Sequence, residues 1–252
     1  MSATDTTASP CLQADWPAPA TVRTLITTRQ GGHSRQPFDS FNLGSHVGDD
    51  ADAVAANREQ LRALLPNEPA WLNQVHGTHV VDAAQVGDTL LDADASFASQ
   101  PGTVCVVMTA DCLPVLLCND DGTVVAAAHA GWRGLCDGVL EASVAATGVE
   151  PSSLMAWLGP AIGPDAFEVG AEVRAAFMAC DPAAEQAFSA IGEGKYLADI
   201  YLLARQRLAA LGVTRVYGGD FCTVIDRERF FSYRRDKSTG RMASLIWLQP
   251  QD

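Results

Sequence analysis

Two apolar runs between Thr103 and Gly134, joined by the turn sequence NDDG, constrain the fold of this chain more than any other feature. Such runs are typical of strands buried on both faces, and the turn predicts a hairpin. Each run is interrupted by one residue that can bind a metal, Cys112 in ADCLP and His129 in AAHAGWRG. His76 interrupts a third apolar segment, WLNQVHG. We expect these three side chains to meet in space.

The other segments predict a layered fold with mixed β-sheets. We predict strands at Val22–Thr28, Ala70–Asp82 with a break near Gly77, Val104–Met108, Pro114–Cys118, Val124–Ala128, Leu154–Leu158, Val213–Tyr217, Arg229–Tyr233 and Met242–Leu248. We predict helices from Asp49 or Asp50 to Leu65 and at Gly134–Thr147, Glu168–Cys180 and Tyr196–Leu211. Helices interspersed among strands indicate an α/β or α+β sandwich. One domain, residues 19–252, is expected after a flexible N-terminal lead-in, residues 1–18.

Composition narrows the classes of partner. With 17 basic and 30 acidic residues, the net charge of −13 disfavours nucleic acids and anionic membranes. No apolar run reaches the roughly 20 residues of a membrane helix, and the N-terminus does not resemble a secretory signal. We therefore expect a cytoplasmic protein that acts on a small molecule.

The cysteine pattern argues against a disulfide framework. The seven cysteines are an odd number, are spread widely, and include no CxxC pair. Five of them are predicted to pack as small apolar residues in or near the core: Cys105, Cys118, Cys136, Cys180 and Cys222.

A thiolate and two imidazoles suit Zn²⁺, and three protein ligands leave a fourth position for water. The spacings of 36 residues from His76 to Cys112 and 17 from Cys112 to His129 match no local metal motif. A single histidine in a strand is commonly a hydrogen-bonded core or edge residue. A single cysteine in a strand is commonly a small buried residue without a functional role. Cu²⁺ is an alternative to zinc, because it binds such ligands more tightly in the divalent series.

Basic residues near these ligands predict an anion site. Arg133 follows His129 closely, and a helix that starts at Gly134 would direct its N-terminus towards an anion. The segment SYRRDKSTGRM concentrates positive charge in an acidic chain. We predict that substrate or phosphate is bound by Arg133, Arg235, Arg241, Asn42 and Gln74. Three further histidines lie in loops or face solvent: His33, His46 and His79.

The motifs WLNQVHG, TADCLPVLL, AAHAGWRG, LGPAIGPDAFEVG, FCTV and FFSYRRDKSTGRMASLIW closely resemble the bacterial laccase-domain family. This family is also described as multicopper polyphenol oxidase-like proteins, YfiH-type purine nucleoside phosphorylases and peptidoglycan editing factors. The resemblance runs from about Thr24 to Trp247. It implies a single-domain sandwich, related to the cytotoxic necrotizing factor fold, and a metal site formed by His76, Cys112 and His129.

The resemblance also implies phosphorolysis of adenosine, inosine and methylthioadenosine together with adenosine deamination. Deamination fits a zinc-bound hydroxide with a nearby acid, for which Asp111 and Glu168 are candidates. We therefore expect a zinc-dependent purine nucleoside phosphorylase with adenosine deaminase activity, in which Asp111 joins the three ligands as a catalytic residue.

Three alternatives stay open. The first is a metal-free Cys–His amide hydrolase that edits peptidoglycan precursors, with Cys112 as nucleophile and His129 as base. The second is a copper-dependent polyphenol oxidase, which the chain fits poorly because it has five histidines and no HxH pair. The third is a binding protein that keeps the metal site without turnover.

Overall fold

The two central apolar runs form an antiparallel pair of strands, as predicted. The computed structural model describes residues 11–87 and 90–250. In it, β9 (Leu113–Asn119) pairs with β10 (Val125–Ala130), and Pro114 lies opposite His129. All residues of both strands are buried.

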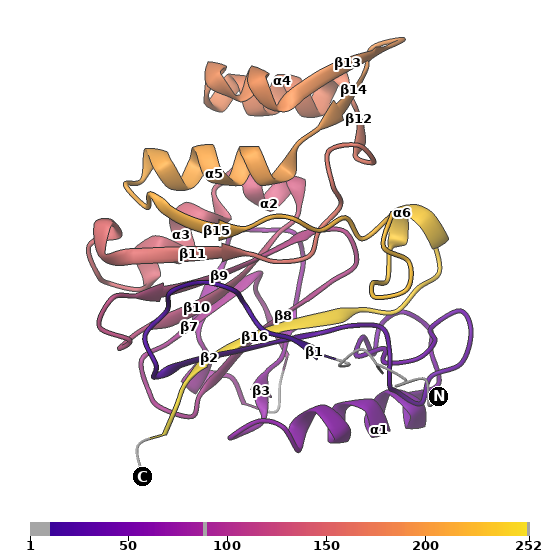
Figure 1. The fold of residues 1–252 in the computed structure, drawn as a ribbon, viewed down its shortest axis with the longest axis vertical. Helices are drawn as coiled ribbons and strands as arrows, with labels where there is room; N and C mark the ends of the chain where they lie inside the picture. Colours follow the sequence, from indigo (N-terminus) through magenta and orange to yellow (C-terminus); the bar gives the residue numbers. More distant parts are fainter. Residues whose placement is uncertain (1–10, 88–89, 251–252) are drawn as a thin grey trace, which may run out of the picture.

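Two mixed sheets form the centre of the molecule (Figure 1). The six-stranded sheet has the order β15 (Arg215–Gly218), β11 (Leu154–Leu158), β9, β10, β7 (Ala95–Ala98) and β5 (Val80–Asp82). The five-stranded sheet has the order β1 (Cys11–Leu12), β2 (Val22–Thr27), β16 (Met242–Leu248), β8 (Val104–Thr109) and β3 (Pro69–Ala70). The strand pairs β11–β15, β5–β7 and β3–β8 are parallel, and the others within these two sheets are antiparallel.

The sheets stack face to face because side chains alternate along each strand. On β9, Val115 and Leu117 face a helical layer, whereas Leu116 and Cys118 face the five-stranded sheet. The helical layer contains α2 (Trp132–Asp137), α3 (Val139–Ala146) and α5 (Ile200–Ala210). On the opposite side, α1 (Ala51–Arg62) covers the outer face of the five-stranded sheet. The predicted α/β sandwich is confirmed.

Smaller elements complete the architecture. A three-stranded sheet, β12 (Glu168–Gly170), β14 (Lys195–Ala198) and β13 (Phe188–Gly192), lies beside α4 (Ala171–Cys180) at the end of the molecule remote from α1. Among the described residues, the remaining elements are β4 (Leu72–Asn73), β6 (Leu91–Asp92), α6 (Tyr233–Asp236) and 3-10 turns at Ala83–Gln85, Pro151–Ser153 and Pro182–Ala187.

Two predicted helices begin later than expected because their first residues belong to strands. Residues 168–170 form β12 and residues 195–198 form β14, and these two strands pair with each other. The partners lie almost thirty residues apart, so local periodicity does not reveal the pairing. The helix predicted at Gly134–Thr147 is divided into α2 and α3 by Gly138, whose φ of 106° is left-handed.

The strand predicted at Arg229–Tyr233 is wrong. The backbone N–H of Arg229 bonds to the Asp226 side chain, and that of Phe231 bonds to the sulfur of Met242. These amides therefore join no sheet, and Tyr233 begins the short helix α6 instead. The segment suggested a strand because aromatic residues are common in strands. In the structure, Phe230 and Phe231 instead pack in a small buried cluster with Met242.

The predicted flexible lead-in is too long at its C-terminal end. Residues 1–10 lie outside the described residues, but Cys11–Leu12 form β1 against β2. Leu12 and Trp16 are partly buried against the core between the two sheets. Within the described part of the chain, no helix is long and apolar enough to cross a membrane.

Candidate metal centre and pocket

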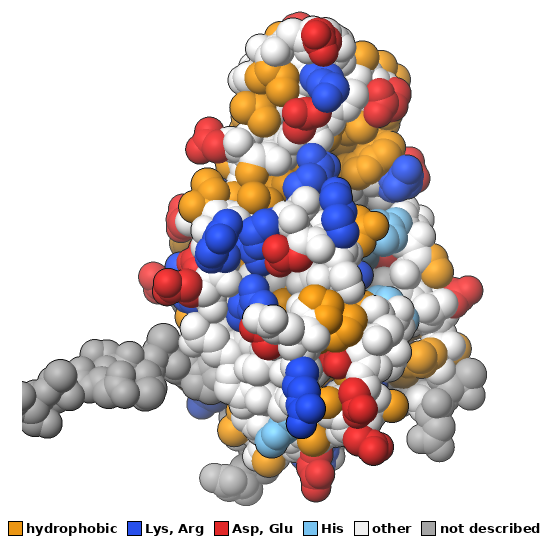
Figure 2. Space-filling view, turned by 90° about the vertical axis from the view of Figure 1, so that its right-hand side faces the viewer, with side chains coloured by type: hydrophobic (Ala, Val, Ile, Leu, Met, Phe, Trp, Pro, Cys, Tyr) orange, Lys and Arg blue, Asp and Glu red, His pale blue; other side chains and the backbone are white. Residues whose placement is uncertain are grey.

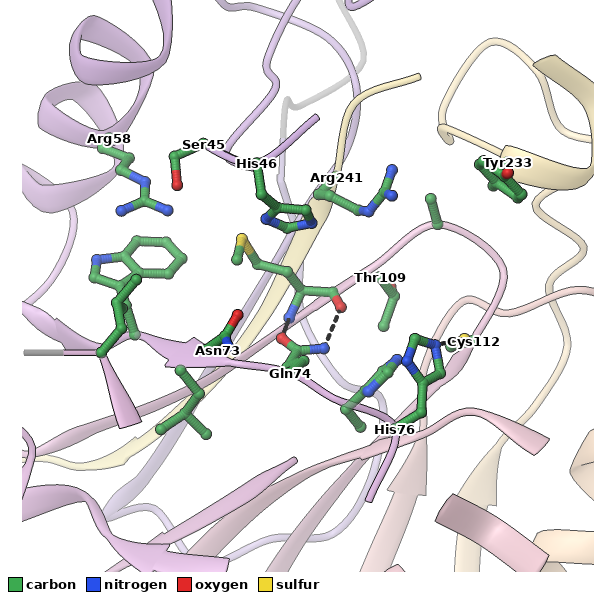
Figure 3. A pocket seen from close by; sticks show the side chains of 16 residues that line it. Ser45, His46, Arg58, Asn73, Gln74, His76, Thr109, Cys112, Tyr233 and Arg241 are labelled. Atoms are coloured by element: carbon green, nitrogen blue, oxygen red, sulfur yellow. Dashed lines mark hydrogen bonds between the residues drawn. The ribbon is translucent and has the colours of Figure 1, made fainter. Parts of the chain in front are cut away.

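The three predicted ligands meet at one end of the six-stranded sheet (Figure 3). Cys112 lies in the turn between β8 and β9, and His129 lies near the end of β10. The pairing of His129 with Pro114 brings the histidine beside this turn. His76, in the loop between β4 and β5, approaches from the side, with its Nε2 3.8 Å from Cys112 Sγ. The ring centroids of His76 and His129 are 4.8 Å apart.

These side chains fit a tetrahedral metal ion. One ligand atom from each of the three lies within 4.8 Å of the others. Around a tetrahedral Zn²⁺, sulfur and nitrogen ligands lie about 3.4–3.6 Å from one another, so only small side-chain adjustments are needed. One thiolate and two imidazoles are soft to borderline ligands that suit zinc or copper rather than magnesium or calcium.

Asp94 organises this site, and sequence reasoning missed it. Its carboxylate is fully buried, and Oδ1 accepts a hydrogen bond from His129 Nδ1 at 2.8 Å. Oδ1 also accepts from the backbone N–H of His76 at 2.9 Å, and Oδ2 accepts from that of Gly77 at 2.6 Å. By holding Nδ1, Asp94 leaves Nε2 of His129 as the ligand atom, the arrangement usual for metal-binding histidines. The available signal was an aspartate between two alanines in the sequence DADASFA.

The charges of Cys112 and His129 stabilise each other in the metal-free site. Burial alone would raise the pKa of Cys112, but the charge of His129 and hydrogen bonds from both histidines outweigh it and lower the pKa to about 6. Burial would likewise lower the pKa of His129, but the Cys112 charge and the Asp94 hydrogen bond raise it to about 9. The pair is therefore thiolate and imidazolium near pH 7, and a metal would displace the imidazolium proton.

The backbone around the ligands is unusual in ways that the site requires. His76 and Asp111 have φ values of 61° and 100°, conformations that L-residues rarely adopt. Gly131, the residue before α2, is in contact with the ligands. A Cβ at this position would lie 2.8 Å from His76 Cδ2 and 3.1 Å from Cys112 Sγ. Glycine is needed here because there is no room for a side chain.

A cavity of about 340 Å³ opens beside the ligands. The described residues that line it carry positive charge and include no carboxylate, although the protein is strongly acidic. The sixteen lining residues are Ser45, His46, Arg58, Trp71, Leu72, Asn73, Gln74, His76, Leu90, Met108, Thr109, Ala110, Cys112, His129, Tyr233 and Arg241. On the face shown in Figure 2, histidine side chains reach the surface beside lysine and arginine side chains.

Arg58 and Arg241 supply the cationic groups of the pocket. Arg58 extends from α1, stacks over the Trp71 ring at 4.1 Å and donates through Nε to Leu43 O. Arg241 donates through Nη1 to the carbonyls of the two preceding residues. Burial lowers the pKa of both arginines, although an arginine stays protonated in proteins. Burial, together with these two charges, also lowers the pKa of His46, which favours its neutral form.

Some of the predicted substrate-binding residues line the cavity, and others lie outside it. Arg241 and Gln74 line the cavity, but both polar atoms of the Gln74 amide bond to the backbone of Met108. Asn42 is not among the lining residues, and its buried amide oxygen accepts from the backbone of Arg241. Arg133 is exposed and stacks on Trp132.

Arg235 and the two candidate acids also lie outside the cavity lining. The Arg235 guanidinium bonds to three backbone carbonyls. Asp111 accepts from the Thr223 hydroxyl and the Arg234 amide, both at 2.6 Å. Glu168 pairs with Lys195 at the surface. A catalytic role for Asp111 stays a prediction. The pocket residues Arg58 and Tyr233 were not predicted. Arg58 resembles an ordinary surface arginine on a helix, and in SYRRDKSTGRM only the basic residues, not Tyr233, indicated a site.

Comparison with known proteins identifies the family of this chain. A family model described as multi-copper polyphenol oxidoreductase laccase matches residues 23–249. This chain belongs to the laccase-domain family. Within the family, it is 60% identical over 235 residues to purine nucleoside phosphorylase YfiH of Shigella flexneri, covering 92% of this chain and 96% of that protein. It is 58% identical over 239 residues to purine nucleoside phosphorylase PA4543 of Pseudomonas aeruginosa, covering 94% of this chain and 98% of that protein.

Two solved structures share the fold. Neisseria meningitidis protein NMB0706 superposes with a TM-score of 0.94 at 57% identity, covering 96% of this chain and 100% of that chain. YlmD of Geobacillus stearothermophilus gives a TM-score of 0.86 at 28% identity, covering 96% of this chain and 97% of that chain. The predicted family is therefore confirmed.

Replacing Gly131 by alanine tests the close approach at the ligands. Gly131→Ala is expected to weaken zinc affinity at least about tenfold, because the added methyl group displaces His76 and Cys112. Competition with a chromophoric chelator measures this affinity. Gly87→Ala is the control, since a Cβ at Gly87 meets nothing within 4 Å. Equal affinities of the two variants would show that the ligands tolerate the methyl group.

Replacing Asp94 by asparagine tests the buried carboxylate. Asp94→Asn removes the negative charge and places an N–H₂ group among N–H donors, so zinc affinity should fall about 10–100-fold. The control is Asp92→Asn, since the Asp92 carboxylate is exposed and accepts from Asn73. Unchanged zinc affinity in Asp94→Asn would show that the Asp94 carboxylate does not organise the site.

Alkylation of metal-free protein tests the charge state of Cys112. After chelation, iodoacetamide should modify Cys112 readily at pH 7 and progressively less as the pH falls through about 6, because the thiolate becomes protonated. Peptide mass spectrometry measures the modification. Cys105 and Cys118, whose pKa burial raises to about 12, should stay unmodified in the folded protein. A labelling midpoint near pH 9 at Cys112 would contradict the thiolate–imidazolium pair.

Proposed function

We propose that this protein is a zinc-dependent purine nucleoside phosphorylase acting on adenosine, inosine and methylthioadenosine, and that the same site deaminates adenosine. The observation that carries the proposal is a pocket with positive charge, no carboxylate among its described lining residues, and the ligand group His76–Cys112–His129 in its wall. Such a pocket favours an anionic co-substrate, and phosphorolysis requires inorganic phosphate. The names of the relatives from Shigella flexneri and Pseudomonas aeruginosa support the same reaction class.

Arg58 and Arg241 are proposed to hold the phosphate. Among the described residues, the two terminal nitrogens of Arg58 have no hydrogen-bond partner, and neither do Nε and Nη2 of Arg241. These groups are available as charge-assisted donors to phosphate oxygens. A phosphate oxygen would attack C1′ of the ribose while the bond from C1′ to the base nitrogen breaks, which yields ribose 1-phosphate and the free base.

The remaining lining residues are proposed to orient the nucleoside. Tyr233 presents a half-exposed ring at the pocket, suitable for contact with a planar base. His46, held neutral, and Thr109 can hydrogen-bond to ribose hydroxyls. A zinc ion held by His76, Cys112 and His129 would supply a Lewis acid and a bound water with a pKa near 7, the chemistry that adenosine deamination needs.

A metal-free amide hydrolase is the second candidate, and one observation favours it. The thiol of Cys112 has a pKa lowered to about 6 and lies beside His129 and His76, as in nucleophilic thiols of Cys–His enzymes. Peptidoglycan precursors would be its substrates. Polyphenol oxidation with copper, suggested by the description of the family, has less support because the chain has only five histidines.

Product analysis separates these functions. Zinc-loaded protein with inosine and phosphate is expected to give hypoxanthine and ribose 1-phosphate, and adenosine should give adenine together with some inosine. Arg58→Ala should raise the KM for phosphate at least about tenfold through loss of a charged donor pair. The control Arg62→Ala lies one turn further along α1, outside the pocket lining, and should leave this KM unchanged.

Each alternative predicts a different result. Release of free ribose at the same rate without phosphate would show that the protein is a nucleoside hydrolase and not a phosphorylase. A covalent acyl adduct on Cys112 after incubation with a wall precursor would support the amide hydrolase. No nucleoside product from zinc-replete protein would remove the proposed function.

A further inference from the structure

Two free cysteines outside the metal centre lie side by side. Cys136 Sγ on α2 and Cys180 Sγ at the end of α4 are 4.0 Å apart. The Cys180 thiol also points at the backbone carbonyl of Cys136, at 3.7 Å. Contrary to the prediction that it packs in or near the core, Cys180 is exposed, whereas Cys136 is buried as predicted. The pair therefore joins one accessible thiol to one protected thiol.

We propose that Cys136 and Cys180 form a reversible disulfide when the protein meets a peroxide. The sulfurs must approach by about 2 Å to reach bonding distance, which is within the range of side-chain rotation for cysteines on two packed helices. α2 and α4 are in contact, so the bridge joins elements that already touch. The proposal is independent of the proposed enzymatic reaction.

The burial of the two thiols sets the order of the chemistry. The exposed Cys180, as thiolate, attacks one oxygen of hydrogen peroxide, the O–O bond breaks, and hydroxide leaves, giving a sulfenic acid. Cys136 then attacks the Cys180 sulfur, the S–O bond breaks, and hydroxide leaves and takes up the thiol proton as water. In total, the two thiols lose two protons and two electrons, and the peroxide is reduced to two waters.

The surroundings of Cys136 slow the second step and confine it to this pair. Burial and the neighbouring Cys180 raise the pKa of Cys136 to about 11, and the positive charge of Arg207 opposes this. Arg207 Nη2 donates to the Cys136 carbonyl at 3.1 Å, so the cation is held beside the pair. A protected thiol of this kind reacts with an adjacent sulfenic acid rather than with peroxide in solution.

The bridge would also support the metal centre. α2 carries Gly134 two residues before Cys136, and a Cβ on Gly134 would lie 2.7 Å from the carbonyl oxygen of Gly77, next to His76. Joining α2 to α4 therefore anchors the helix that contacts the ligand loop. The bridge closes a loop of 44 residues, which restricts the unfolded chain.

Peptide mapping tests the bridge directly. Full-length, zinc-loaded protein is treated with hydrogen peroxide, alkylated and digested with trypsin without reduction. Cleavage after Arg133, Arg174 and Lys195 places Cys136 in peptide 134–174 and Cys180 in peptide 175–195, each with a single cysteine. We expect these two peptides to be linked, and to separate on treatment with dithiothreitol.

Thermal unfolding provides the second measurement. The oxidised protein should melt roughly 5–10 °C higher than the reduced protein, as expected for a disulfide that closes a loop of this length without strain. Cys180→Ser, an exposed substitution, should lose both the linked peptide and the shift. Cys222→Ser, a control outside the pair, should keep both.

Three results would overturn the proposal. One is linkage of peptide 175–195 to any peptide other than 134–174. Another is sulfinic or sulfonic acid on Cys180 without any bridge. The third is a bridge that lowers the melting temperature, because such a bridge would not fit the folded structure.

Discussion

The buried carboxylate of Asp94 is the interaction on which the metal centre depends. A fully buried charge is costly unless hydrogen bonds and an opposite charge compensate it. Asp94 receives a hydrogen bond from the His129 ring and from the backbone amides of residues 75–77. These bonds outweigh burial and keep the pKa of Asp94 below its usual value. One side chain thus fixes the orientation of one ligand and the loop that carries another.

The two-sheet sandwich makes this arrangement rigid. The buried hairpin β9–β10 fixes Cys112 and His129 relative to each other, since both lie at the same end of a paired register. The loop with His76 is less constrained by sheet pairing, because it connects β4 and β5, which belong to different sheets. Hydrogen bonds to Asp94 and the close contact with Gly131 supply the missing constraint. Sheet packing therefore positions two of the ligand atoms, and polar and close contacts position the third.

The pocket shows how an acidic protein can attract an anion. The net charge of −13 is spread over the whole chain, whereas the charges of Arg58 and Arg241 converge on one cavity whose described lining residues include no carboxylate. Local charge near a site has more effect on binding than distant charge, because salt screens interactions beyond about 10 Å. These two residues come from α1 and from the loop before β16. The sandwich brings them together although they are far apart in the sequence.

The sequence by itself determined the buried hairpin, the mixed α/β sandwich, and the identity of His76, Cys112 and His129 as one group, because these follow from apolar patterns and from long, specific motifs. Only the tertiary structure decided the roles of Asp94 and Arg58, the pairing of β12 with β14, and the proximity of Cys136 to Cys180. Each of these depends on a contact between residues distant in the chain. Local composition does not reveal such contacts, because an aspartate between alanines or an arginine on an amphipathic helix looks the same at a site as it does on an ordinary surface.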